Sequence, residues 1–280
     1  MARASGAAHP AAGARGESCV VTGGARGIGR GIAERMVARG YAVVLTDVDA
    51  AGAVRTAGEI GAVAGLGLDV RDPEAHRAAA VEAASYGVLT AWFNNAGVGD
   101  DGRLAELSEE AVRRLVEVNL LGTLWGMRAA LAAFAESGRG GDVVNTASLA
   151  GLGPVPGYSV YAATKAAIVS ASMSCDVESP RGVRVHALCP DGVQTAMLDG
   201  QTPGGLGNLL VLSGGRILGV DEVAEAAVAL VGSRRVVRSL PPWRGGVIRA
   251  SALAPSVTAK ALGVFVARGR RALQRRAGSN

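Results

Sequence analysis

The sequence predicts an α/β protein: one doubly wound parallel sheet with helices on both faces, plus a basic C-terminal helical extension. Short apolar stretches of strand length alternate with longer stretches of helix length between residues 17 and 200, as is typical of a buried parallel sheet. A glycine-rich turn follows the first of these stretches. A chain of 280 residues with 49% hydrophobic content can bury a full core, so we expect one large domain with small additions.

The two ends of the chain differ from its centre. Residues 1–16 mix alanine, glycine and arginine without hydrophobic periodicity or the apolar stretch of a signal peptide. We expect a disordered leader over 1–16, the α/β domain over 17–250 and the basic extension over 251–280. No charge-free apolar run approaches the roughly 20 residues that cross a bilayer, because the long run after Asp142 is rich in glycine, serine and proline.

The cysteines and histidines indicate neither disulfides nor metal. Three cysteines, widely spaced in apolar surroundings, fit a reducing cytoplasm. The three histidines lie far apart and away from other ligands, so we predict no metal site. His186, within VRVHALCP, is expected to be a strand residue.

The first element is predicted to be a strand at Cys19–Val21, followed by the turn TGGARGIGRG and a helix through Arg39. Gly23 would permit the tight turn. Gly27 and Gly29 would let a phosphate and the strand approach the helix, whose free N–H groups and dipole favour an anion. Because the chain has 41 glycines, a purely structural turn is the alternative.

The next stretch supports the phosphate-binding interpretation. Gly40 ends the helix, and YAVVLTDVD has the composition of a second strand. Asp47 closes that strand about 20 residues after the glycines, where a carboxylate that binds a ribose is expected. The strand–helix–strand unit is then complete.

The stretch SLAGLGPVPGYSVYAATK resembles an active site in its residue types and spacing. Tyr161 and Lys165 are four residues apart, so a helix would place them on one face. A cation beside a phenol lowers its pKa from near 10 towards neutrality, which suits a general acid or base. Ser148 could donate a hydrogen bond to the same substrate oxygen. The alternative is an ordinary helix surface, but the chain has four tyrosines and only two lysines.

These motifs together resemble those of the short-chain dehydrogenase/reductase family, which has a Rossmann-type domain. The resemblance covers about residues 17 to 200 and rests on TGGARGIG, on LDV at Leu68–Val70, on NNAG at Asn94–Gly97 and on VNLLG around Asn119. It implies a catalytic set of Asn119, Ser148, Tyr161 and Lys165. In that set Tyr161 exchanges the substrate proton, Lys165 lowers the Tyr161 pKa and holds the nicotinamide ribose, Ser148 orients the substrate oxygen, and Asn119 supports a water relay to Lys165.

The resemblance also implies the cofactor contacts: Gly23, Arg26, Gly27, Ile28, Gly29, Asp47, Val48, Asp69, Val70, Asn95, Ala96, Gly97, Tyr161, Lys165, Pro190, Val193 and Thr195. The family's usual Pro-Gly is Pro190-Asp191 here, which predicts a different local backbone path. Asp47 can accept the ribose hydroxyls of NAD and would repel a 2′-phosphate. Arg26 stands where a basic residue often assists NADP in this family. We favour NAD over NADP because the Asp47 contact is direct.

Residues 198–215 are predicted to form a mobile lid. The segment is rich in glycine and carries four consecutive apolar residues, Leu209–Leu212, which indicate an apolar substrate pocket. A plain surface loop is the alternative.

The C-terminus departs from the family pattern. We predict a helix over Asp221–Val231 and a last strand over Val236–Leu240. From Arg234 to Asn280 the chain has eleven basic and no acidic residues. Within this part Pro255–Arg276 is predicted to form an amphipathic helix. Its apolar face would carry Val257, Ala261, Val264, Phe265 and Ala272, and its basic flanks Lys260, Arg268, Arg271 and Arg275.

Three partners for this helix remain open: an anionic membrane surface, an acidic carrier or coenzyme-linked substrate, and the protein's own body or oligomer partner. Gly263 and Gly269 weaken an isolated helix, which favours packing. Nucleic acid is not expected, because the segment has one aromatic residue and no binding module.

The sequence thus predicts a cytoplasmic enzyme, with peripheral membrane contact left open, that transfers hydride between NAD or NADP and a secondary alcohol or ketone, with an apolar substrate. The alternative is a non-catalytic NAD-binding regulator on the same scaffold. By resemblance to the family we expect a homo-oligomer.

Overall fold

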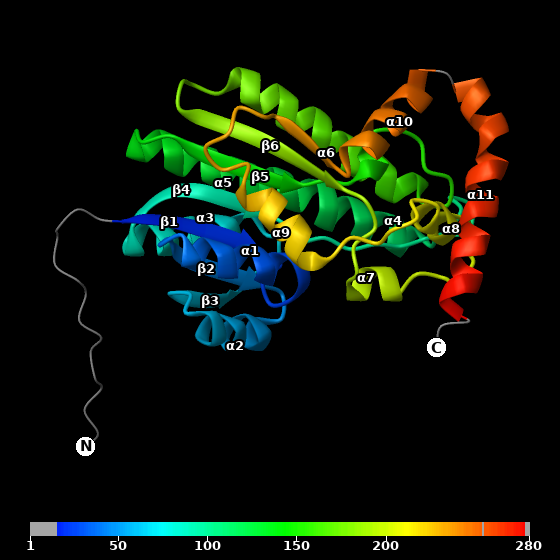
Figure 1. Cartoon of the computed structure of the whole chain (residues 1–280). Helices are drawn as coiled ribbons and strands as arrows, with labels where there is room; N and C mark the ends of the chain where they lie inside the picture. Colours follow the sequence, from blue (N-terminus) through cyan, green and yellow to red (C-terminus); the bar gives the residue numbers. More distant parts are fainter. Residues whose placement is uncertain (1–15, 254, 278–280) are drawn as a thin grey trace.

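A computed structural model describes residues 16–253 and 255–277; the predicted leader, apart from Gly16, lies outside this described part. One seven-stranded sheet runs through the centre in the order β3-β2-β1-β4-β5-β6-β7, and every neighbouring pair is parallel (Figure 1). The strands are β1 (Glu17–Thr22), β2 (Ala42–Asp47), β3 (Ala64–Gly67), β4 (Val88–Asn94), β5 (Gly141–Thr146), β6 (Val183–Pro190) and β7 (Val237–Leu240). The strand order reverses direction between β1 and β4, which is where such sheets open a crevice at the carboxyl ends of the strands.

Helices cover both faces of the sheet. They are α1 (Gly27–Ala38), α2 (Ala50–Ile60), α3 (Pro73–Tyr86), α4 (Glu109–Leu115), the π-helical turn η1 (Val116–Leu121), α5 (Gly122–Ser137), the short 3₁₀ turn η2 (Leu149–Gly151), α6 (Ser159–Glu178), α7 (Ala196–Asp199), α8 (Leu206–Leu212), α9 (Val220–Val228), α10 (Pro242–Leu253) and α11 (Pro255–Ala277). The predicted fold class is confirmed, and so is the helical C-terminal extension.

The core follows the two-residue period of the strands. In β1, Cys19 and Val21 pack with α1 and α9, whereas Val20 between them packs on the opposite face with α3 and α5. Successive side chains of a strand point to opposite faces, so a strand buried on both faces is apolar throughout. This explains why the strands of this protein show continuous apolar stretches in the sequence.

The segment Glu109–Ser137, which spans α4, η1 and α5, is long and apolar enough to cross a membrane by length and composition alone. In the structure 44% of its most apolar window is buried inside the protein. Met127 and Phe134 of this segment belong to the core on the α3 side of the sheet. A core helix therefore accounts for the composition.

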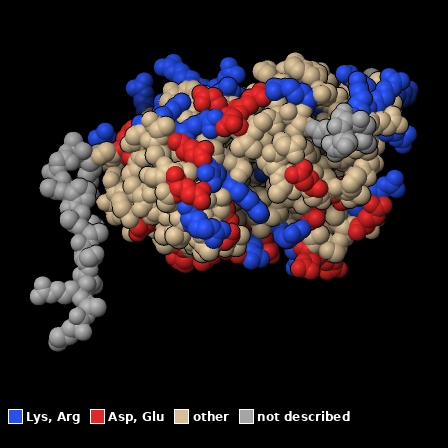
Figure 2. Space-filling view, turned by 60° about the horizontal axis from the view of Figure 1, so that its bottom comes forward, with Lys and Arg blue, Asp and Glu red and all other residues tan. Residues whose placement is uncertain are grey.

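The C-terminal helix α11 lies against α8 at the end of the molecule (Figure 1). A Cβ atom at Gly269 would lie 2.0 Å from the carbonyl oxygen of Leu209, so glycine is what permits the close approach of the two helices. Val264 is 62% exposed, contrary to its predicted place on the apolar face, and the side chains of Val257 and Ala261 lie outside the described part. Basic side chains gather at this end of the molecule, on the right in Figure 2.

His76 links a covering helix to the loop that follows β3. Its side chain is fully buried on α3, and its Nε2 lies 2.9 Å from the carbonyl oxygen of Val70. Because a carbonyl oxygen only accepts, Nε2 carries the proton and donates. Burial lowers the pKa of His76, and the hydrogen bond to Val70 opposes this shift only in part.

We predict that this histidine makes the fold sensitive to mild acid. Below about pH 6.5 the unfolded chain takes up a proton on His76 that the folded chain resists, so the free energy of unfolding falls as the pH drops. Urea unfolding of the wild type and of His76→Gln at about pH 7.5 and 5.5 measures the effect, since glutamine keeps the donor without titrating. The variant should lose less stability over this interval, and equal losses in the two proteins would contradict the prediction.

Candidate active site

A cavity of about 1400 Å³ opens at the carboxyl ends of the strands and extends from the glycine turn after β1 to α10 and α11. Nearly all of the predicted site residues line it. The exceptions are Gly29 and Asn119. The parallel sheet thus brings together residues that are up to 172 positions apart, from Gly23 to Thr195.

The glycine turn is shaped by close backbone contacts. Gly23 has a φ of +64°, and a Cβ there would lie 2.7 Å from the Cα of Ala96. A Cβ at Gly29 would lie 2.0 Å from the carbonyl oxygen of Gly23, so Gly29 serves the packing of helix on turn rather than the cavity wall. Arg26 precedes α1 in an extended conformation without a side-chain cap, which leaves the first N–H groups of the helix available. Such a turn suits the pyrophosphate of a dinucleotide.

Asp47 at the end of β2 is held in place by backbone donors. The N–H of Ala25 donates to Oδ2 and the N–H of Asp49 to Oδ1, each at 3.1 Å. The carboxylate lines the cavity beside the glycine turn, where a ribose would lie. After β3, Asp69 also lines the cavity, and a hydrogen-bonded ion pair with Arg71 at 2.6 Å lowers its pKa.

Asn95 fixes the junction between β1 and β4. Its Nδ2 donates to the carbonyl oxygens of Thr22 and Gly23, both at 3.2 Å, and its Oδ1 accepts from Thr146 Oγ1 at 3.4 Å. Thr146 ends β5, so one side chain holds three strand ends together. At Gly97 a Cβ would lie 3.6 Å from Lys165 Nζ, and glycine leaves this space free.

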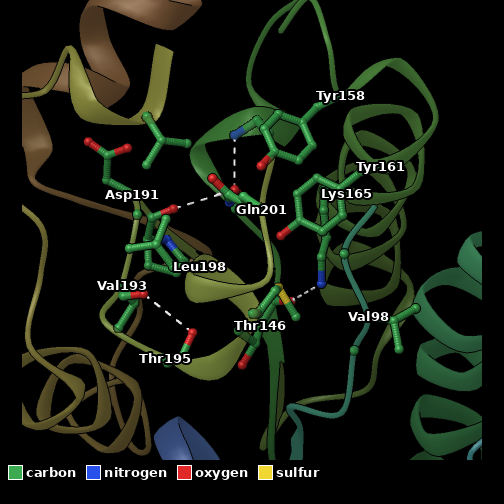
Figure 3. A pocket seen from close by; sticks show the side chains of 18 of the residues that line it. Val98, Thr146, Tyr158, Tyr161, Lys165, Asp191, Val193, Thr195, Leu198 and Gln201 are labelled. Atoms are coloured by element: carbon green, nitrogen blue, oxygen red, sulfur yellow. Dashed lines mark hydrogen bonds between the residues drawn. The ribbon is translucent and has the colours of Figure 1, made fainter. Parts of the chain in front are cut away.

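Tyr161 and Lys165 lie on one face of α6, as the sequence predicts. Lys165 Nζ donates to the carbonyl oxygen of Thr146 at 2.8 Å and lies 5.7 Å from the centroid of the Tyr161 ring. Figure 3 shows both side chains at the cavity wall. Burial lowers the pKa of Lys165 to about 8.

The expected direction of the Tyr161 pKa shift is wrong for this structure. Burial raises the pKa of Tyr161 to about 12, although a hydrogen bond with Ser148 acts in the opposite direction. The physical reason is that removing a phenolate from water is costly, while the Lys165 ammonium is bonded to Thr146 rather than to the phenol oxygen.

Ser148 and Asn119 have different surroundings. Ser148 Oγ accepts from the N–H of Ala150 at 3.1 Å and lines the cavity. Asn119 is fully buried in the π-helical turn η1, where its Oδ1 accepts from the N–H of Val98 at 2.8 Å and its Nδ2 donates to the Val98 carbonyl at 2.9 Å. The Asn119 side chain therefore fixes the chain after Gly97 instead of facing the cavity.

The departure at Pro190-Asp191 has a partner that sequence reasoning missed. Asp191 Oδ2 lies 3.1 Å from Arg244 Nε on α10, and the two side chains are only 8% and 13% exposed. Arg244 also donates to the carbonyl oxygen of Leu210 at 2.7 Å. Burial raises the pKa of Asp191 and lowers that of Arg244. The sequence did carry a signal for this ion pair: Asp191 stands where the family has glycine, and the C-terminal part of the chain offers many basic residues as partners.

The predicted lid forms two short helices, α7 and α8. Leu210 and Val211 line the cavity, whereas Leu209 and Leu212 are buried in the protein. The C-terminal extension was not expected to reach this site, but it does. Further apolar residues of the lining are Leu198 of the lid, Val155 and Pro156 of the loop before α6, and Trp243, Val247, Ile248 and Phe265 of the C-terminal extension.

The fold and the site define a dinucleotide-binding protein with a tyrosine–lysine centre, and the comparisons give its family. A family model described as short chain dehydrogenase matches residues 17–204. A sorbitol dehydrogenase from Cereibacter sphaeroides is 37% identical over 188 residues, covering 66% of this chain and 73% of the relative. A 2,5-dichloro-2,5-cyclohexadiene-1,4-diol dehydrogenase from Sphingobium indicum is 35% identical over 224 residues, covering 77% of this chain and 90% of the relative.

A solved structure agrees with these relatives. The short chain dehydrogenase/reductase from Burkholderia phymatum in complex with NAD has a TM-score of 0.77 at 28% identity and covers 87% of this chain and 95% of its own. The chain belongs to the short-chain dehydrogenase family. It is an NAD(P)-dependent oxidoreductase that transfers hydride between a nicotinamide cofactor and an alcohol or ketone.

Proposed function

We propose that this enzyme acts on a bulky, mainly apolar secondary alcohol or ketone and uses NAD in preference to NADP. The observation that supports the substrate class is the cavity next to Tyr161, where Leu210, Val211, Trp243 and Phe265 contribute apolar walls. Each buried methylene group of a substrate adds about 0.8 kcal/mol to binding. The same site, with Tyr161, Lys165 and Ser148 at its wall, supports the chemistry.

The proposed chemistry assigns a separate task to each side chain. With a pKa of about 12, Tyr161 is protonated at neutral pH and can give its proton to a carbonyl oxygen in the reductive direction. In the oxidative direction, the nearby Lys165 ammonium favours the phenolate that must accept the proton. Ser148 orients the substrate oxygen. The nicotinamide cofactor, when bound, supplies or accepts the hydride.

Asn119 is proposed to act by positioning. Its side chain fixes Val98. Gly97, the residue before Val98, leaves open the space beside Asn119 Oδ1 and Lys165 Nζ, since a Cβ there would lie 3.1 Å and 3.6 Å from these atoms. The water relay from Asn119 to Lys165 stays a prediction.

The C-terminal helix is proposed to be part of the enzyme body. Phe265 and Arg268 line the cavity, and Gly269 packs on Leu209. These contacts support the docking alternative over a membrane surface. We also keep the expectation of a homo-oligomer in the cytoplasm, which rests on family resemblance and on the cysteines.

The cofactor preference gives a first prediction. Because Asp47 is fixed by two backbone donors and is negatively charged, it should disfavour the 2′-phosphate of NADP by at least roughly tenfold in affinity. Titrating NADH and NADPH separately, with nicotinamide fluorescence as the signal, measures the ratio. Asp47→Asn is the matched control and should narrow the difference. Tighter binding of NADPH by the wild type would overturn the assignment.

The proton-transfer role gives a second prediction. Tyr161→Phe keeps the ring and removes the oxygen, so turnover should fall by roughly 10²-fold or more while NADH affinity stays within a factor of about two. Tyr86→Phe is the control, because the Tyr86 hydroxyl bonds Glu82 on the surface of α3. If Tyr161→Phe keeps activity within tenfold of wild type, the proton-transfer role is wrong. A wild type that binds NADH but turns over no substrate would favour the alternative of a non-catalytic NAD-binding regulator.

The apolar walls give a third prediction. In a panel of alcohols and ketones, kcat/KM should be higher for bulky apolar compounds than for small polyols by roughly tenfold or more, since two or more additional methylenes are buried. Val211→Thr, which keeps the shape of the side chain and adds a hydroxyl, should reduce this ratio. A clear preference of the wild type for small sugars would refute the apolar substrate class.

A further inference from the structure

Tyr158 carries a buried hydroxyl group for which the described part of the chain provides no hydrogen-bond partner. The residue is 6% exposed, and its Oη is one of three buried side-chain atoms without a partner among the described residues, with Thr46 Oγ1 and His76 Nδ1. Of these three residues, Tyr158 is the one that lines the cavity. A buried polar group left without a partner destabilises the folded protein, so this hydroxyl requires an explanation.

The ring of Tyr158 cannot turn away to find a partner. Its centroid lies 5.7 Å from that of Tyr161 at an interplanar angle of 58°. A Cβ at Gly207 would lie 2.3 Å from Tyr158 Cε2, so the start of α8 packs directly on the ring. The backbone is also fixed, because the Tyr158 N–H donates to Val155 at 3.0 Å and its carbonyl accepts from Ala162 at 2.7 Å.

The hydroxyl faces the same side of the cavity as the proton-transfer group. Tyr158 precedes Tyr161 by three residues, about one helical turn, and Figure 3 shows their hydroxyl groups turned in the same direction. Burial and, to a smaller extent, the charge of Asp101 raise the pKa of Tyr158. It therefore stays protonated at working pH and is a hydrogen-bond donor there.

We propose that Tyr158 is a specificity-determining residue that donates a hydrogen bond to a second oxygen atom of the substrate, near the oxygen that Tyr161 protonates. The substrate class is then a diol, a hydroxyketone or a diketone on an otherwise apolar skeleton, with the two oxygens on neighbouring carbons or across a small ring. This inference rests on the proposed function. It deepens that function, because an apolar pocket alone does not select for a second oxygen, whereas a site built to hydrogen-bond a hydroxyl rejects the analogue that lacks it.

The test compares two substrates that share a carbon skeleton, 1-tetralol and cis-1,2-dihydroxytetralin, in the full-length wild type and in Tyr158→Phe. The wild type should favour the diol by roughly 10–100-fold in kcat/KM, the range expected when an otherwise unpaired buried hydroxyl gains a partner. Tyr158→Phe should lose this preference through a higher KM for the diol. Tyr86→Phe should behave as wild type. A retained diol preference, or an equal loss for both substrates, would overturn the proposal.

Measurements of protein stability and of ligand binding distinguish a purely structural role of Tyr158 from the proposed role in substrate recognition. Because Tyr158→Phe removes an unpaired buried hydroxyl, its thermal unfolding midpoint should stay the same or rise, whereas a decrease would indicate a structural role. Calorimetric titration of both ligands into Tyr161→Phe and into the Tyr158→Phe/Tyr161→Phe double variant, each with NADH, measures recognition without turnover. Selective binding of the diol that is lost without Tyr158 would support the proposal even if no compound of the panel were turned over. Absence of selective binding would overturn the proposal for Tyr158 and leave the proton-transfer role of Tyr161 unaffected.

Discussion

The site depends on a chain of hydrogen bonds that joins the glycine turn to the lysine on α6. Asn95 donates to the carbonyl oxygen of Gly23 and accepts from Thr146 Oγ1, while the Thr146 carbonyl accepts from Lys165 Nζ. These links connect β1, β4 and β5 at their carboxyl ends, where the strand order reverses. Polar groups buried at this junction have few hydrogen-bond partners other than one another, and leaving one unpaired would lower the stability of the fold. The relative positions of the glycine turn and Lys165 are therefore set by these side-chain hydrogen bonds.

Burial decides the electrostatics of the site. Lys165 and Tyr161 are each moved towards their neutral forms, the lysine to a pKa of about 8 and the tyrosine to about 12. Proximity of a cation and a phenol along one helix face is thus not enough to produce a phenolate. Asp191 and Arg244 show the same balance, because each is buried and each offsets the desolvation of the other. Breaking such a pair by removing one partner leaves an uncompensated charge, so we interpret it as the anchor of α10 on the loop after β6.

The C-terminal extension combines a basic surface with contacts to the cavity. Eleven basic residues without an acidic one suggest an external anionic partner. In the structure the helix carries two kinds of side chain: Arg270 and Arg271 are exposed and lie away from the cavity lining, whereas Phe265 and Arg268 line the cavity. Gly269, which lowers helix propensity, allows the helix to pack against α8. The extension is part of the cavity wall, to which both α10 and α11 contribute.

The sequence by itself determined the parallel sheet, the glycine turn, the position of Asp47 and the Tyr161–Lys165 pair, because each depends on contacts within a few residues or on the period of a strand or helix. Most of the predicted site residues also line the cavity, since the carboxyl ends of parallel strands meet at one edge. Only the tertiary structure decided the pKa direction of Tyr161, the partner of Asp191, the orientation of Asn119 and the unpaired hydroxyl of Tyr158. Each of these features depends on how deeply a group is buried and on its contacts with residues far away in the sequence, as between Asp191 and Arg244. Local residue spacing determines neither the burial nor these contacts.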